Sequence, residues 1–350
     1  MLWFRTYLPV GFVLLLVVRM AGSSAPAEAQ PAHQAPESIP RNTVLASPAA
    51  VPLDLSTGQP VVEVRLNGRG PYRMFLDTGA GTTVLDDDLA KELGLAVLDT
   101  TRLGDPVSPQ AIRADVVELD SISIGTARFE GVRAVAWDRS TLRQNMPDKP
   151  RGVVGLGVFH DLVLALDYPK QVLRLRRDVL PDADGARVLE YTSPHGIPVI
   201  PVRIGNRTYQ AHLDSGSPGG FNLPLAQKDS LNLLGEVKEI GRGRTANTEL
   251  VIYGAQVADT ARIGAHAFPQ AMVQFNDQLP QANLGGRVLR EFVVTLDQKN
   301  RRVRFDRTGR PPAAPAATPA PAPGAAPSPA PPPAKPVAPP KNLPPGGNKG

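Results

Sequence analysis

The sequence predicts an all-β protein made of two similar lobes, each a small barrel-like sheet, with few and short helices. Three observations predict this fold. Short apolar or alternating runs are separated by turn residues at regular spacing. Signals for helices are few. A set of landmarks in the middle of the chain occurs twice, in the same order.

The N-terminal residues 1–29 are typical of a signal peptide. Arg5 precedes an apolar run from Tyr7 to Val18, and Ala27-Glu28-Ala29 has the small-x-small pattern of a cleavage site. The run is shorter than the about 20 residues that span a membrane. We therefore expect a secreted or periplasmic protein. The alternative is an uncleaved N-terminal anchor that associates the protein with the membrane or envelope.

Two further segments are predicted to lie outside the lobes. Residues 30–50 are predicted to be a linker, and residues 309–350 a disordered tail rich in Pro and Ala, because neither has a periodic apolar face that buries a core. The 350-residue chain has no cysteine and therefore no disulfide, which fits a bacterial periplasm. A net charge of +5 with scattered basic residues argues against a nucleic-acid partner.

The repeat divides the remaining chain into a first lobe at 51–180 and a second at 181–308. Leu76-Asp77-Thr78-Gly79 in the first copy corresponds to Leu213-Asp214-Ser215-Gly216 in the second, with the two aspartates 137 residues apart. Later landmarks repeat at similar offsets, with Leu166-Asp167 matching Leu296-Asp297. Duplication predicts a monomer whose lobes form a pseudo-dimer within one chain. The alternative is a homodimer in which each lobe pairs with its counterpart.

Strands and turns can be placed in each copy. Val61 to Leu66 alternates, turns at Asn67-Gly68 and returns from Tyr72, which predicts a hairpin; the second copy turns at Gly205-Asn206. A short helix is expected within 85–93, and another after Gly155. Further strands are predicted at 121–124, 132–137, 162–166, 172–175, 292–296 and 302–305.

The Asp-Thr-Gly and Asp-Ser-Gly motifs each follow an apolar strand. One such motif is weak, because tight turns use these residues for conformational reasons. Its occurrence at the same point in each copy makes the two aspartates a pair.

At these residues the chain resembles the aspartic proteases. The segment from Phe75 to Leu85 resembles the active-site strand and turn of retropepsin-like enzymes, and Leu213 to Ser217 resembles the second motif of two-lobed pepsin-type enzymes. Val153-Val154-Gly155 and Asn283-Leu284-Gly285 resemble the hydrophobic-hydrophobic-Gly segment beside the catalytic turn. The resemblance covers about 60–307. It implies an exported bacterial protein with two tandem lobes, acting as an aspartic endopeptidase on extended peptides.

The resemblance implies that Asp77 and Asp214 are the catalytic residues. Two carboxyls at hydrogen-bonding distance share one proton, because both cannot ionise cheaply. The ionised member draws a proton from a water that attacks the peptide carbonyl. This chemistry needs no cofactor and no metal.

The neighbours of the aspartates have expected roles. Gly79 and Gly216 let the backbone approach the carboxyls closely. By resemblance, Thr78 and Ser215 bond across to the other lobe. Ala80 follows the first motif and Ser217 the second. Because a serine hydroxyl there donates to the adjacent carboxylate, we expect Asp214 to be the ionised partner and Asp77 to carry the proton.

Two flap hairpins are expected over the cleft, at 101–117 and 241–251. The first has no obvious flap tyrosine, and Pro218-Gly219-Gly220 is unusual after the second motif, so the chain departs from pepsin-type enzymes at both points.

Other readings of the sequence are weaker. The five histidines lack the spacing of zinc ligands. His212 is either a packed strand residue or a modulator of the aspartates. Gly155-Leu156-Gly157 lacks the third glycine of a dinucleotide loop, and Ser217 lies in no Gly-x-Ser-x-Gly motif. The alternative function is a non-catalytic peptide- or envelope-binding protein that keeps the fold.

Overall fold

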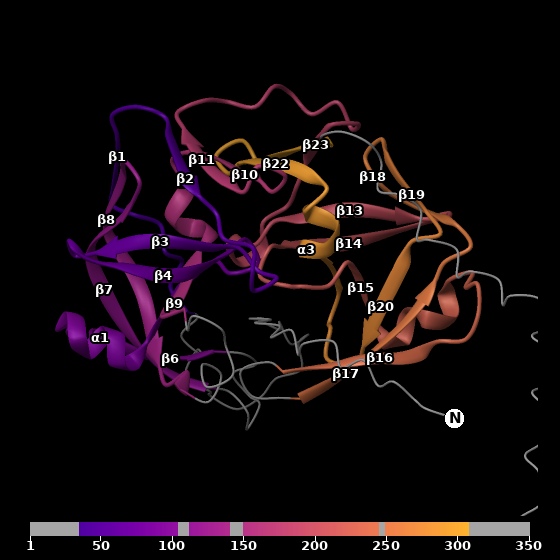
Figure 1. Ribbon diagram of the computed structural model, residues 1–350, viewed down its shortest axis with the longest axis horizontal. Helices are drawn as coiled ribbons and strands as arrows, with labels where there is room; N and C mark the ends of the chain where they lie inside the picture. The colour runs from indigo at the N-terminus through magenta and orange to yellow at the C-terminus, as the bar shows by residue number, and fades with distance from the viewer. Residues whose placement is uncertain (1–34, 104–111, 141–149, 245–248, 308–350) are drawn as a thin grey trace, which may run out of the picture. The chain divides into compact units, whose positions relative to one another are not determined.

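The computed structural model describes residues 35–103, 112–140, 150–244 and 249–307 (Figure 1). These residues are mostly in strands, with a few short helices, which confirms the predicted all-β class. The predicted signal peptide and tail lie outside the described residues. No helix among the described residues is long and apolar enough to cross a membrane.

The first lobe is an eight-stranded sheet, drawn in indigo to magenta in Figure 1. Its strand order is β1-β8-β5-β9-β4-β3-β7-β6, and an additional β7–β8 pairing closes six of these strands into a barrel. The strands are β1 (Asn42–Leu45), β3 (Val61–Leu66), β4 (Arg69–Asp77), β5 (Thr83–Asp86), β6 (Asp99–Leu103), β7 (Ile112–Ile124), β8 (Ala127–Trp137) and β9 (Gly152–Gly155).

A nine-stranded sheet carries the second aspartate, in the order β16-β17-β20-β15-β21-β14-β13-β18-β19. Its strands are β13 (Val199–Ile204), β14 (Arg207–Asp214), β15 (Phe221–Pro224), β16 (Lys238–Arg244), β17 (Glu249–Gln256), β18 (Thr260–Ile263), β19 (His266–Pro269), β20 (Met272–Asn276) and β21 (Ala282–Gly285).

A six-stranded sheet joins segments of both predicted lobes, in the order β12-β23-β22-β10-β11-β2. At its centre β10 runs antiparallel to β22, with Leu164 opposite Leu296. The two strands that end in the repeated Leu-Asp landmark therefore pair with each other. The strands are β2 (Ala49–Pro52), β10 (Val163–Asp167), β11 (Val172–Arg176), β12 (Val188–Glu190), β22 (Phe292–Asp297) and β23 (Arg302–Arg307).

The helices are short and follow strands. The helix expected within 85–93 begins at Asp87, because Leu85 is still in β5, and it ends at Gly94 in the left-handed conformation (φ 71°). The stretch after Gly155 forms a 3-10 turn rather than an α-helix. The helices are α1 (Asp87–Leu93), η1 (Leu156–Phe159), η2 (Pro194–Gly196), η3 (Leu225–Ser230) and α3 (Gly286–Leu289).

The predicted hairpins form at the predicted turns. Asn67 and Gly68 both have positive φ, at 49° and 77°, which matches the twist of the flanking strands β3 and β4. In the second lobe β13 and β14 pair across the turn that contains Gly205.

The segment predicted as a linker, 30–50, contains ordered strands where the structure describes it. β1 pairs with β8, with Thr43 opposite Phe129, and β2 pairs with β11, with Val51 opposite Leu173. Each strand has only four residues, and their alternation includes Thr and Ala as buried residues. Such short edge strands carry too weak an apolar pattern to be distinguished from a linker by composition.

An aromatic cluster packs against the six-stranded sheet. The Phe292 ring lies 5.5 Å from that of Phe305 and 6.1 Å from that of Phe268, both edge to face. The Arg307 guanidinium lies 4.5 Å from the centre of the Phe268 ring. Phe292 is fully buried at the centre of this cluster.

We expect Phe292→Ala to lower the free energy of unfolding by about 3–5 kcal/mol, because it removes a buried ring and leaves a cavity. Chemical denaturation measures the effect. Leu234→Ala is the control, since Leu234 is 52% exposed in the same half of the chain and should change stability little. Equal losses for the two variants would contradict the assignment of Phe292 to the core.

Candidate active site

The two aspartates end equivalent strands. Asp77 is the last residue of β4 and lies opposite Gly155 of the parallel strand β9. Asp214 is the last residue of β14 and lies opposite Gly285 of the parallel strand β21. Both side chains are buried, with the residues 2% and 3% exposed. The local topology around the two motifs is therefore the same.

The residues after the aspartates form a reciprocal set of hydrogen bonds between the two turns. The Thr78 backbone N–H donates to Ser215 Oγ (2.9 Å), and the Ser215 N–H donates to Thr78 Oγ1 (2.9 Å). Each hydroxyl in turn donates to the carbonyl before the opposite aspartate, Thr78 to Leu213 (2.7 Å) and Ser215 to Leu76 (2.9 Å). All four bonds are buried and hold the two turns in register.

Each glycine of the motifs lies against the aspartate of the other turn. A Cβ atom on Gly79 would fall 2.7 Å from Asp214 Cγ, and one on Gly216 would fall 2.5 Å from Asp77 Cγ. No side chain fits at that separation. The glycines therefore allow the close approach of the two turns that the sequence predicted.

The two carboxyl groups receive different hydrogen bonds. Asp77 Oδ1 accepts from the Gly79 backbone N–H at 2.7 Å. Asp214 Oδ2 accepts from the side-chain amide of Asn283 at 2.5 Å. Gln59, a buried residue just before β3, donates to the Gly216 carbonyl and adds a further bond between the turns.

Comparison with family models finds a match in the first of these two motifs. Residues 62–163 match the model of the aspartyl protease family, and this range contains the first motif and Ala80. The first lobe is an aspartic-protease-like lobe. No curated protein matches the chain. Among solved structures, the chain resembles the basic 7S globulin from soybean, with 14% identity and a TM-score of 0.44 over 74% of this chain and 94% of that one.

The electrostatics of this aspartic-protease-like site are those of a coupled pair. Burial raises the pKa of both aspartates, and the charge of Asp214 raises that of Asp77 further, to well above its usual value. The Asn283 amide acts in the opposite direction on Asp214 and lowers its pKa. This is the pattern of two buried carboxyls that do not both ionise readily and can share one proton.

The expected placement of the proton on Asp77 stays a prediction, and the structure shows a side-chain donor to Asp214 other than the Ser217 hydroxyl expected from the sequence. Ser217 contributes its backbone N–H to Asp214, and the side chain that donates to this carboxyl is Asn283. Sequence reasoning placed Asn283 only as part of an apolar-apolar-Gly segment. One feature of the sequence pointed to a polar role for Asn283: the repeat places it at the position that Val153 occupies in the first copy.

His212 lies on β14, two residues before Asp214, and is partly buried. Burial and the nearby His195 lower the pKa of His212 to about 4. Among the interactions of the described residues, none joins His212 to either aspartate. The structure favours a packed, neutral strand histidine over a modulator of the pair.

Both flap candidates begin and end in paired strands. β6 pairs with β7, and β16 pairs with β17. The tips of these hairpins, at 104–111 and 245–248, lie outside the described residues. Within the described residues, no three His, Asp or Glu side chains gather in a way that could hold a metal ion.

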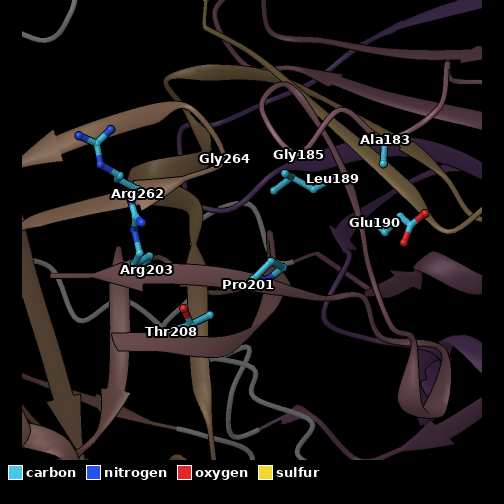
Figure 2. Close-up of a pocket in the computed structure, with 9 residues that line it drawn as sticks. All are labelled: Ala183, Gly185, Leu189, Glu190, Pro201, Arg203, Thr208, Arg262 and Gly264. Atoms are coloured by element: carbon cyan, nitrogen blue, oxygen red, sulfur yellow. The ribbon is translucent and has the colours of Figure 1, made fainter. Parts of the chain in front are cut away.

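A separate hollow of about 480 Å³ lies on the second lobe (Figure 2). Arg203 of β13 and Arg262 of β18 line it as direct cross-strand neighbours. Neither aspartate contributes to its walls, so this hollow is distinct from the site between the turns.

We expect Thr78→Val to lower the free energy of unfolding by about 2–4 kcal/mol. The substitution leaves the Leu213 carbonyl and the Ser215 N–H buried without their partner, and each such group costs about 1–3 kcal/mol. Thermal or chemical denaturation measures it. The matched control is Thr295→Val, because the buried Thr295 hydroxyl has no hydrogen-bond partner among the described residues. A loss no greater than that of the control would show that the bonds between the turns do not stabilise the fold.

Proposed function

We propose that the protein is an aspartic endopeptidase whose single active site takes Asp77 from the first lobe and Asp214 from the second. The observation that carries the proposal is the pair itself, since two buried carboxyls with raised pKa values lie on turns that bond directly to each other. Maintaining such a pair is costly, because a buried charge is unfavourable without a compensating role. The aspartyl protease match over the first lobe supports the same class of chemistry.

The proposed hydrolysis proceeds in two steps, and the pair of carboxyls carries one proton before and after it. Asp214, ionised, takes a proton from a water held between the carboxyls, and the oxygen of this water attacks the peptide carbonyl carbon. Asp77 donates its proton to the carbonyl oxygen, which gives a neutral tetrahedral diol. In the second step Asp214 returns its proton to the leaving nitrogen as the C–N bond breaks. Asp77 recovers a proton from a diol hydroxyl, and the pair regains its starting state.

The substrate we propose is a peptide in extended conformation. β6 and β16 are the terminal strands of their sheets, so each has one side free of strand partners within its sheet. Such edges bind an extended backbone through main-chain hydrogen bonds without demanding a particular sequence. Both edge strands belong to the hairpins predicted to be flaps. We further propose that the protein acts as a monomer, exported to the periplasm or beyond through its N-terminal segment.

Asp77→Asn and Asp214→Asn should each lower kcat/KM on a peptide library by about 10²–10⁴-fold, because each removes one member of the acid–base pair. Cleavage is measured by mass spectrometry on the mature protein. Asp229→Asn, at an exposed position in the same half of the chain, is the matched control and should leave cleavage unchanged. Cleavage that survives both active-site substitutions would refute the mechanism, and a wild-type protein that binds peptides but cuts none would favour the binding function.

The pH dependence follows from the directions of the two shifts. Activity requires Asp214 ionised and Asp77 protonated, so kcat/KM should fall on the acid side as Asp214 gains a proton and on the basic side as Asp77 loses one. Because the pKa of each is raised, both limbs of the bell should lie above pH 3.8, the usual aspartate value. A kcat/KM profile from pH 3 to 8 tests this. A flat profile across that range would contradict the shared-proton pair.

A further inference from the structure

Behind Asp214 lies a pair of buried asparagines. Asn222 of β15 and Asn283 of β21 are cross-strand partners, and they are 8% and 2% exposed. Buried amides are costly unless their hydrogen bonds are satisfied. The presence of two buried amides at this position therefore needs a physical explanation.

The corresponding place in the first lobe is apolar. There β5 and β9 pair in the same way beside Asp77, and the partners are Val84 and Val153, both buried. The fold thus accepts two valines in this position. The asparagines beside Asp214 are not a requirement of the architecture.

The asparagines form a directed chain of hydrogen bonds that ends on one carboxyl. Asn222 Nδ2 donates to Asn283 Oδ1 at 3.1 Å and also contacts the Gly220 carbonyl at 3.2 Å. Because Asn283 Oδ1 is used as an acceptor, its Nδ2 is turned to Asp214, where it donates to Oδ2 at 2.5 Å. The chain delivers a donor to Asp214, and the valine pair delivers none to Asp77.

We infer that Asn283, oriented by Asn222, is a positioning residue that fixes the polarity of the catalytic pair by holding Asp214 as the anionic base. This inference rests on the proposed endopeptidase function. An amide donor stabilises a carboxylate more than a carboxylic acid, so it favours the state with the charge on Asp214 and the proton on Asp77.

The other groups that face the pair do not supply this asymmetry. Tyr168, which follows β10, is buried near both aspartates, and burial raises the pKa of its phenol so that it stays neutral. The charge of Arg290, which follows α3, lowers the pKa of the Tyr168 phenol, in opposition to burial. His212, on β14 itself, is neutral above about pH 4. The side-chain donor that distinguishes Asp214 from Asp77 is Asn283.

Two variants test the inference by activity. Asn283→Val removes the donor, and Asn222→Val combined with Asn283→Val rebuilds the valine pair of the first lobe. In both, the acid limb of the kcat/KM profile should move up by about one to two pH units, as expected for loss of a charge-assisted hydrogen bond. The basic limb should move less, so the bell narrows. A purely structural role would lower activity at every pH and leave the acid limb in place, which would overturn the inference.

Gln274→Met is the matched control. Gln274 also supports the second turn, through its Oε1 and the Gly220 N–H at 3.1 Å, but it makes no hydrogen bond to either aspartate. Its substitution should leave the acid limb where it is, whatever it does to the overall rate. An equal shift in this variant would show that disturbing the turn, rather than removing the donor, moves the limb.

A titration that needs no cleavage separates this inference from the proposed function. In Asp77→Asn protein, the carboxyl of Asp214 is followed by carbon-13 NMR with labelled aspartate, and Asn283→Val added to this background should raise its pKa. If wild-type protein cleaves no peptide, the proposed function fails, and this shift still decides the role of Asn283. An unchanged Asp214 pKa would overturn the inference even if wild-type protein cleaves peptides.

Discussion

The four buried hydrogen bonds between Thr78 and Ser215 are the constraint on which the rest of the site depends. Each residue uses its hydroxyl as both donor and acceptor, so the two turns satisfy each other and neither is complete alone. The glycines that follow can then lie against the opposite carboxyls, and the charge of Asp214 raises the pKa of Asp77. The proposed catalytic pair therefore depends on two turns whose threonine and serine hydroxyls form hydrogen bonds with the opposite turn.

The parts of this arrangement that are local in sequence could be predicted from it. The hairpin at Asn67-Gly68 and the strand leading to each aspartate depend on short motifs or on their repetition. The pairing of Thr78 with Ser215 was implied by the resemblance to the aspartic proteases. The edge strands within 42–52 were missed, because four-residue strands leave little pattern. The central pairing of β10 with β22 was also not predicted, since it joins residues far apart in the chain and depends on register.

Asn283 shows why the electrostatics of the site were harder to predict than its geometry. The polarity of the pair was expected from Ser217, a neighbour of Asp214 in sequence. The actual donor comes from β21 and is itself oriented by Asn222 on β15, across a cross-strand contact between residues 61 positions apart. Adjacency in the sequence indicates which residues share a turn. The hydrogen bonds and charges around a buried carboxyl also come from strands that are distant in the sequence.

The unequal neighbours of the two aspartates bear on why both lobes are in one polypeptide. A site assembled from two identical subunits would carry the same residues on both sides of its axis, so each carboxyl would have either valines or asparagines behind it. A tandem chain escapes this symmetry, because each half can change independently of the other. One carboxyl here has a valine pair beside it and the other has an asparagine pair. Only a chain that encodes both halves can assign these different neighbours to the same two carboxyls in every molecule.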